Sequence, residues 1–376
     1  MAHYKMSDVV IEVKDKESSP STSKYERFVG LEHYVSGDVE ISQYGKTDSL
    51  ESTMKVFQAG DILVARRNVY LRRASRVSFD GLTSGDSIVL RANDKVMARI
   101  LPFVLNTDAF WNYADQHSDG TMSKRLSPKL LLDYEFDLPD EGLEDFSDLL
   151  WAVNDTRNSY RQLLIKTDDM VKSQFIEMFG DLDSNTKGWK KEPLKKHADI
   201  LVGYPFPSSG YSEKGIKIIG GYNLMQGYIN WDDSKYWPTM ENYEQYLLKD
   251  GDIVMAMDRP WTGDGFKMAF IDGTQLPALL IQRTACIRAS DIENEFLYTL
   301  LNSQWFADHC NVKGSLVPHI SNKDMNSFMI YIPPNELQKE FVRLYQQSDK
   351  SKFELNKAIE KTTNLMRDLM RQEFGK

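Results

Sequence analysis

The chain has 376 residues, of which 41% are hydrophobic and 27% charged, and its formal net charge is −9. These values are ordinary for a globular protein of two or three domains, and no stretch approaches the ~18 consecutive apolar residues of a membrane span. The negative charge weighs against nucleic-acid binding, since neutralising phosphates takes lysine and arginine, although an average of this kind would hide one basic face.

The cysteine content points to a reducing compartment. There are only two cysteines, Cys286 and Cys310, and they are not spaced as a CxxC metal motif. Two are too few for a disulfide framework. The first residues show no secretory signal. We therefore expect a cytoplasmic protein.

Residues 1–138 are predicted to form a first α+β domain. Short apolar runs at residues 9–13, 61–65 and 87–90 are typical of strands, and turn residues such as Ser36-Gly37-Asp38 separate them. A short helix is expected near residues 101–113. We expect the strands to be curved and mostly antiparallel.

Two polar clusters in this domain are candidates for DNA contacts. The first follows the Gly60-Asp61-Ile62 strand and comprises Arg66, Arg67, Asn68, Tyr70, Arg72 and Arg73. The second, Lys124 and Arg125, follows Gly120-Thr121. Arginine pairs bidentately with guanine or phosphate, asparagine pairs with adenine, and tyrosine donates to phosphate. The alternative is a solvated basic loop without a ligand.

Residues 139–181 are predicted to form a long amphipathic helix. Apolar residues recur at steps of three, four and seven from Leu143 to Met178, which places them on one side of a helix. Pro139 at the start and Gly180 at the end are typical boundary residues. A helix of this length would span roughly 63 Å, and its apolar side needs a partner.

Residues 182–333 are predicted to form a second α+β domain. Strands are expected at residues 216–219 and 252–256, and a short helix at residues 293–308. The loop after the Gly251-Asp252-Ile253 strand contributes the candidates Arg259, Trp261 and Lys267, and a Gly-Ser loop contributes Lys313, Ser315 and His319. A structural role is an equal alternative for Trp261, and the commoner role for an isolated residue such as His319.

Residues 334–376 are predicted to form a second long helix, because they repeat the first. Residues 139–180 align without a gap with residues 334–375 at a shift of 195, from Pro139 on Pro334 to Phe179-Gly180 on Phe374-Gly375. The domains repeat more weakly, with shifts that drift from 190 to 194. The chain is therefore two copies of a domain followed by a helix, and we expect the helices to pack as a coiled coil. Core helices of one globular domain are the alternative.

This order of elements resembles the specificity subunit of type I restriction–modification enzymes over essentially the whole chain. The local sequences that carry the resemblance are residues 201–206 with Ser208 and Ser209, residues 215–223 with Gly227, and residues 314–321. The first half departs from this pattern at residues 18–23, where Ser18-Ser19-Pro20-Ser21-Thr22-Ser23 replaces a Gly-x-Pro-Phe segment.

The resemblance implies a DNA-reading subunit without catalytic activity. Each domain would read one half of a split, asymmetric target, and the helices would form an antiparallel coiled coil that fixes the spacing. Two methyltransferase subunits would dock on this rod, and nuclease–translocase subunits would join them. S-adenosylmethionine, ATP and Mg²⁺ are expected in those partners, and no cofactor in this chain. Two alternatives remain: a specificity subunit of a type II cutting-and-methylating enzyme, and a coiled-coil adaptor that binds proteins.

Catalytic motifs are missing from the sequence. Ile332-Pro333-Pro334-Asn335 lacks the Asn or Asp and the aromatic residue of a methyltransferase motif, and no GxxxxGK[ST] phosphate loop is present. Glu12-Val13-Lys14 has the common ExK form of nucleases, but no upstream carboxylate lies in a strand-like setting. The six histidines show no metal spacing, and there is no G-x-S-x-G elbow. We predict no catalytic residue and no metal site.

Overall fold

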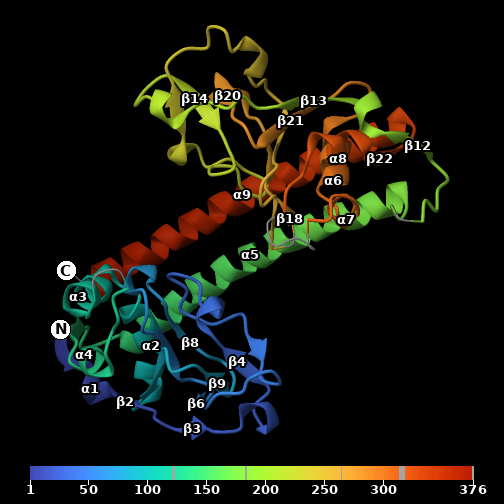
Figure 1. The fold of residues 1–376 in the computed structure, drawn as a ribbon. Helices are drawn as coiled ribbons and strands as arrows, with labels where there is room; N and C mark the ends of the chain where they lie inside the picture. The colour runs from blue at the N-terminus through green and yellow to red at the C-terminus, as the bar shows by residue number, and fades with distance from the viewer. Residues whose placement is uncertain (121–122, 183, 264, 313–317, 375–376) are drawn as a thin grey trace. The chain divides into compact units, whose positions relative to one another are not determined.

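The computed structural model describes residues 1–120, 123–182, 184–263, 265–312 and 318–374 (Figure 1). The chain divides into two compact units. Unit 1 comprises residues 1–162 and 355–376, and unit 2 comprises residues 163–354. Each unit contains one α+β domain and parts of both long helices.

The α+β domain of unit 1 is built on two sheets, of order β2-β10-β7-β8 and β3-β6-β9-β4-β5. Its strands are β1 Ala2–Lys5, β2 Val10–Glu12, β3 Lys16–Glu17, β4 Arg27–Val29, β5 Gly45–Lys46, β6 Met54–Phe57, β7 Ile62–Ala65, β8 Ala74–Arg76, β9 Gly81–Thr83, β10 Ser87–Ala92 and β11 Glu135–Leu138. Its helices are α1 Met6–Val9, α2 Lys95–Val104, α3 Asp108–His117 and α4 Pro128–Leu132, with 3-10 turns at Pro20–Thr22, Leu31–His33 and Val69–Leu71 (η3). All strand pairs are antiparallel except β4 with β9.

The central strand β7 is continuously apolar because it lies between two hydrophobic cores. Leu63 and Ala65 pack in the core that the two sheets share, whereas Ile62 and Val64 pack in the core under α2 and α3. A strand covered on both faces has no solvent side, so the usual alternation of polar residues is lost.

The α+β domain of unit 2 repeats this plan, with sheets of order β13-β21-β16-β19 and β15-β14-β20. Its strands are β12 Lys190–Pro193, β13 Ala198–Val202, β14 Ile216–Ile219, β15 Lys235–Trp237, β16 Ile253–Ala256, β17 Trp261–Thr262, β18 Gly265–Phe266, β19 Met268–Phe270, β20 Ala278–Leu280, β21 Thr284–Ala289 and β22 Met329–Ile332. Its helices are α6 Asn294–Leu301, α7 Gln304–His309 and α8 Asn322–Ser327. The 3-10 turns are Leu194–Lys196, Ser208–Gly210, Trp231–Asp233, Glu244–Tyr246 and Gly273–Gln275.

The four-stranded sheets of the two units correspond strand by strand. One ion pair recurs in both, Asp61 with Arg91 in unit 1 and Asp252 with Arg288 in unit 2. The arginines differ by 197 in number and the aspartates by 191. The repeat therefore does not drift steadily between 190 and 195, as the sequence comparison suggested, because extra residues precede β21 and the shift later falls back to 194.

The short helix expected in each domain is in fact two helices. Thr107 separates α2 from α3 and Ser303 separates α6 from α7, and the two hydroxyls accept hydrogen bonds from Phe110 N and Phe306 N, both at 3.2 Å. A hydroxyl at this position caps a new helix start, and the chain turns there.

The two long helices are α5, Leu143–Phe179, and α9, Asn335–Phe374. In unit 1 the beginning of α5 packs on the end of α9, where the Phe146 and Phe374 rings lie 5.5 Å apart. In unit 2 the end of α5 packs on the beginning of α9, where the Phe175 and Phe341 rings lie 5.2 Å apart. The helices therefore run antiparallel within each unit, and the predicted α+β class with paired long helices is confirmed. No helix in the described part of the chain is long and apolar enough to cross a membrane.

Candidate nucleic-acid interface

The structure brings the two basic clusters of unit 1 into one place. The loop between β7 and β8 and the segment before α4 are joined by backbone hydrogen bonds, from Asn68 N to Lys124 O at 3.0 Å and from Leu126 N to Arg66 O at 2.9 Å. We call this pair of segments, residues 66–73 and 123–126, junction 1. Sequence alone placed its two halves some fifty residues apart without linking them.

One carboxylate holds two arginines of junction 1. Asp86, just before β10, accepts a hydrogen bond from Arg125 Nη2 at 2.7 Å and pairs with Arg67 Nε at 3.0 Å. Both guanidinium groups remain about half exposed. An exposed ion pair is weak in water, so these arginines can exchange the carboxylate for an incoming anion at little cost.

Arg66 and Arg73 lie behind this surface. Arg66 Nε donates to Leu126 O at 3.1 Å, and Arg73 donates to Leu31 O at 3.1 Å and to Arg67 O at 2.9 Å. Arg73 is only 9% exposed, and burial lowers the pKa of both side chains. Their bonds to backbone carbonyls fix the loop, so we assign them a supporting position in junction 1.

The tip of junction 1 is a left-handed turn. Asn68 and Arg72 have φ of 55° and 49° and flank η3, which leaves Tyr70 at the tip with 65% of its surface exposed. Asn68 Oδ1 accepts from Ser123 Oγ at 2.9 Å, which ties the tip to the second segment. Of the candidates in this loop, Tyr70 is thus the most fully presented to solvent.

Lys124 and Arg72 are engaged with acidic groups at the two sides of the junction. Lys124 Nζ donates to Asp115 Oδ2 at 2.8 Å, and Arg72 Nη1 donates to Asp108 Oδ1 at 2.5 Å. Hydrogen bonds from Arg72 and from Arg371 lower the pKa of Asp108. Arg72 is therefore turned away from the tip, toward α3 and α9.

Unit 2 contains the corresponding pair of segments, which we call junction 2: residues 257–263 with 265–267, and residues 318–320. Arg259 N donates to Pro318 O at 2.9 Å, and Ile320 N donates to Met257 O at 2.8 Å. Arg259 adopts φ of 45°, as Asn68 does in junction 1, and its side chain is exposed. The candidates Lys313 and Ser315 lie outside the described residues.

A carboxylate again holds two basic groups in junction 2, but it stands at another position. Asp258 pairs with Arg283 Nη1 at 3.0 Å and with His319 Nδ1 at 2.5 Å. Asp258 occupies the position of Arg67, Arg283 that of Asp86, and His319 that of Arg125, as the equivalent backbone hydrogen bonds and bridges establish.

Lys267 lines a cavity beside junction 2, whereas Trp261 does not. The Trp261 ring packs edge-on against Phe266 at 4.8 Å, and its Nε1 donates to Gly263 O at 2.8 Å. Lys267 Nζ donates to Gly221 O at 2.5 Å. The cavity measures about 420 Å³, and its lining includes Tyr211, Tyr222, Lys235, Arg259, Lys267 and Arg283.

Sequence reasoning missed Asp86, Arg283 and Lys235. Asp86 and Arg283 come from the turn before β10 and β21, far along the chain from the loops they hold, and no local motif marks them. Lys235 lies with its Nζ 4.8 Å from the Tyr222 ring centre, and burial raises the pKa of Tyr222 to about 12. In the described residues no group of three or more His, Cys, Asp or Glu side chains is placed to hold a metal ion.

Residues 187–364 match the model of the type I restriction modification DNA specificity domain. The chain is 31% identical over 176 residues to the EcoAI specificity subunit of Escherichia coli, and the match covers 44% of this chain and 30% of that protein. It is 24% identical over 313 residues to the MjaVIII specificity subunit of Methanocaldococcus jannaschii, covering 76% of this chain and 73% of that protein. The chain is thus similar to type I specificity subunits, and its residues 187–364 match their DNA specificity domain.

Solved structures of type I systems share the fold of this chain. The type I S subunit from M. genitalium superposes with a TM-score of 0.52 at 14% identity, covering 98% of this chain and 95% of that chain. A chain solved in work on complex assembly and conformational transition of the type I R-M system gives 0.50 at 19% identity, covering 100% and 97%. At such identities the likeness concerns the fold alone.

Proposed function

We propose that this chain is a type I specificity subunit and that it reads a bipartite, asymmetric DNA target, one half with each α+β domain. The observation that carries the proposal is the recurrence of one junction in both domains. Each junction joins the same two segments by the same backbone hydrogen bonds, and in each a pair of exposed basic groups shares one carboxylate. The side chains differ between the junctions, as two different half-sites require.

The charges of the junctions support DNA contact despite the net charge of the chain. Arg67 and Arg125 outweigh Asp86 in junction 1, and Arg259, Lys267 and Arg283 outweigh Asp258 in junction 2. Half-exposed guanidinium groups suit phosphate or guanine, and Tyr70 adds a donor at the tip of junction 1. These local charges are opposite in sign to the net charge of −9 of the whole chain, which therefore does not describe these surfaces.

We further propose that α5 and α9 set the spacing of the half-sites and dock two methyltransferase subunits, which nuclease–translocase subunits join. One helical turn added to the helices would move the domains by ~5.4 Å. Large apolar side chains stand exposed on both helices, among them Ile165, Met170, Ile176 and Phe353, and a partner would cover them. In this proposal the chain is non-catalytic and cytoplasmic, and its partners bind S-adenosylmethionine, ATP and Mg²⁺.

The test is selection of bound sequences from a random DNA duplex pool, using the chain purified with its co-encoded methyltransferase subunit. We expect two short motifs separated by a fixed spacer. Arg67→Ala should lose the motif read by unit 1 alone, and Arg259→Ala should lose the motif read by unit 2 alone. Arg343→Ala, an exposed arginine on α9 away from both junctions, is the matched control and should keep both motifs.

Other outcomes separate the alternatives. Loss of both motifs in either single variant would contradict the assignment of one half-site to each domain. Absence of any enrichment, with binding insensitive to salt, would contradict DNA reading and favour the protein-binding adaptor, since electrostatic DNA binding weakens steeply with salt. A co-encoded partner that both cuts and methylates would identify the type II arrangement.

A further inference from the structure

Unit 1 contains a cavity of about 590 Å³ that the DNA-reading proposal does not use. It is lined by the Ser36–Asp38 segment, by Arg72 at the end of junction 1, by the connection between α2 and α3, and by α5 and α9. Ligand sites commonly measure ~300–1,000 Å³, so a molecule of nucleotide size fits. All of its lining residues belong to unit 1.

The lining is strongly basic in a chain that is acidic overall. Two carboxylates, Asp38 and Asp108, face five guanidinium groups, those of Arg72, Arg157, Arg161, Arg367 and Arg371. Asp38 pairs with Arg157 and Arg161, and Asp108 pairs with Arg72 and Arg371. Five positive charges against two negative ones leave an excess of three for an anion to neutralise.

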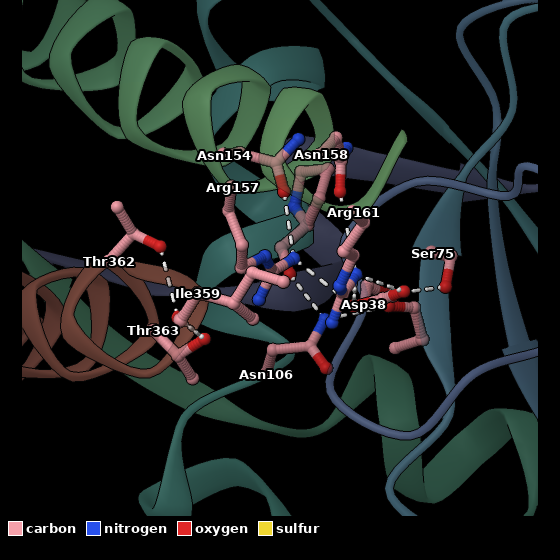
Figure 2. A network of polar contacts seen from close by, with 12 residues as sticks. Asp38, Ser75, Asn106, Asn154, Arg157, Asn158, Arg161, Ile359, Thr362 and Thr363 are labelled. Carbon is pink, nitrogen blue, oxygen red and sulfur yellow. Dashed lines mark hydrogen bonds and ion pairs between the residues drawn. The ribbon is translucent and has the colours of Figure 1, made fainter. Parts of the chain in front are cut away.

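Among these arginines, Arg157 has the largest desolvation cost because its side chain is almost fully buried. It is 3% exposed, and its Nη2 donates to Asp38 Oδ1 at 3.1 Å and to Asn154 Oδ1 at 2.9 Å (Figure 2). Its Nε is buried and has no hydrogen-bond partner in the described part of the chain. Burial accordingly lowers the pKa of Arg157. Asp38 must also serve Arg161, whose Nη1 lies 2.9 Å from both of its carboxylate oxygens. Arg157 is a buried cation that shares the negative charge of Asp38 with Arg161. A second anion bound nearby would therefore stabilise it.

The corresponding place in unit 2 is balanced. Lys352 stands at the position of Arg157, since both helices follow the shift of 195, and it pairs with Asp168 at 3.1 Å and with Asp349 at 3.0 Å. Asp168 corresponds to Thr363 in unit 1, a lining residue of the cavity that carries no charge. One cation thus has two carboxylates in unit 2, whereas two cations share one carboxylate in unit 1. The excess charge is a property of unit 1 and not of the repeated fold.

The α9 wall of the cavity also carries apolar side chains beside its two arginines. Met366 and Met370 are buried on α9, and Phe374 follows them one helical turn later. A lining that combines guanidinium groups with methionine and phenylalanine suits a ligand with a charged end and a flat apolar body. Guanidinium forks match phosphate oxygens bidentately, and flexible thioethers pack well on aromatic rings.

We propose that this cavity binds a small phosphate-bearing anion of nucleotide size, with its phosphates on the arginines Arg161, Arg367 and Arg371 and its base on the apolar side chains of Met366, Met370 and Phe374. A concave site suits a free molecule better than the backbone of a DNA duplex. The proposal goes beyond DNA reading and does not depend on it. It would revise the expectation that this chain binds no cofactor of its own.

The test is isothermal titration of the full chain with ATP and with inorganic pyrophosphate, at low salt and without metal ions. We expect one site per chain and tighter binding of ATP than of pyrophosphate, because only ATP has a base that can pack on Met366, Met370 and Phe374. Arg161→Gln and Arg371→Gln should each weaken binding roughly tenfold, the usual effect of losing one charge-assisted hydrogen bond. Arg343→Gln, outside the cavity on the same helix, should bind as the unchanged chain does.

A thermal-shift measurement guards against a folding defect. Ligand should raise the melting temperature of the unchanged chain and of Arg343→Gln, and should leave that of Arg371→Gln nearly unmoved. Absence of binding by both ligands would overturn the proposal, as would an equal loss in Arg371→Gln and Arg343→Gln. A loss of DNA affinity in Arg371→Gln without any binding of ATP or pyrophosphate would overturn it in favour of a backbone phosphate.

Discussion

Junctions 1 and 2 share a backbone and differ in where their charges stand. In junction 1 the acid comes from the turn before β10, and the loop and the second segment supply the two bases, Arg67 and Arg125. In junction 2 the acid, Asp258, is on the loop, and the bases are Arg283 from the turn and His319 from the second segment. Each junction keeps one acidic side chain between two basic ones. The number of acidic and basic side chains is therefore the same, but their positions on the surface that a ligand would contact differ. The permutation suits a repeated fold whose two copies read different sequences.

Deeper in each domain the two copies share one buried Asp–Arg ion pair. Breaking this pair should have the largest effect on the free energy of unfolding. Asp61, 2% exposed, pairs with Arg91 and also accepts the Gln58 N–H at 2.8 Å. Asp252 does the same with Arg288 and Lys249 N. Asp61→Ala or Asp252→Ala should each lower the free energy of unfolding of its own unit by ~3–5 kcal/mol, because an arginine and a backbone N–H lose their acceptor. Hydrogen exchange of the peptides holding β7 and β16 measures the two units separately.

Asp148→Ala is the matched control for this prediction. Asp148 pairs with Arg99 at 2.6 Å in unit 1, but its side chain is largely exposed. Its removal should cost less than ~1 kcal/mol. If Asp148→Ala and Asp61→Ala lowered the free energy of unfolding equally, burial would not determine how much the recurring ion pair stabilises its unit.

The acid of each junction should matter less to stability and more to DNA binding. Asp86→Ala frees Arg67 and Arg125, and Asp258→Ala frees Arg283 and His319 from their shared carboxylate. Each variant should raise the affinity for DNA of unrelated sequence several-fold. The ratio of affinity for its own half-site to affinity for unrelated DNA should therefore fall. Affinity measured against salt concentration should steepen by about one counterion in either variant.

The contrast between the variants tests the comparison itself. Asp86→Ala should weaken selection of one motif and Asp258→Ala that of the other. If both variants weakened the same motif, the two junctions would not be separate reading surfaces. An unchanged salt dependence would show that the acid does not compete with DNA phosphate for the bases.

Sequence periodicity predicted the elements that local chemistry determines. The apolar spacing of α5 and α9 and their gapless repeat identified two paired helices, and apolar runs located β7, β14 and β16. The break at Thr107 escaped notice because apolar residues continue on both sides of it. Sequence also named Arg67, Arg125 and Arg259 as candidates, and whether they contact DNA stays a prediction.

The acids and the turn arginine could not be found in the same way. Asp86 and Arg283 meet their partners only when a hairpin brings β10 against β7 and β21 against β16. The shift of 197 at these strands departs from the shifts on either side, so the sequence repeat did not align Asp86 with Arg283. Ion pairs between segments distant in sequence leave no periodic signal, whereas a helix face does.

We expect the smallest change in the free energy of unfolding when the acidic and basic residues of one ion pair in junction 2 are exchanged. In the double variant Asp258→Arg with Arg283→Asp, junction 2 takes the charge order of junction 1, with the acid in the turn and bases on the loop and, when His319 is protonated, on the second segment. The partners are exposed by a third or more, so the free energy of unfolding should change by less than ~0.5 kcal/mol. Chemical denaturation of the double variant and of each single variant measures this, and the single variants should both be less stable than the double one. A double variant less stable than either single one would mean that the backbone of junction 2 does not accept the other order, and that the two copies differ in more than their side chains.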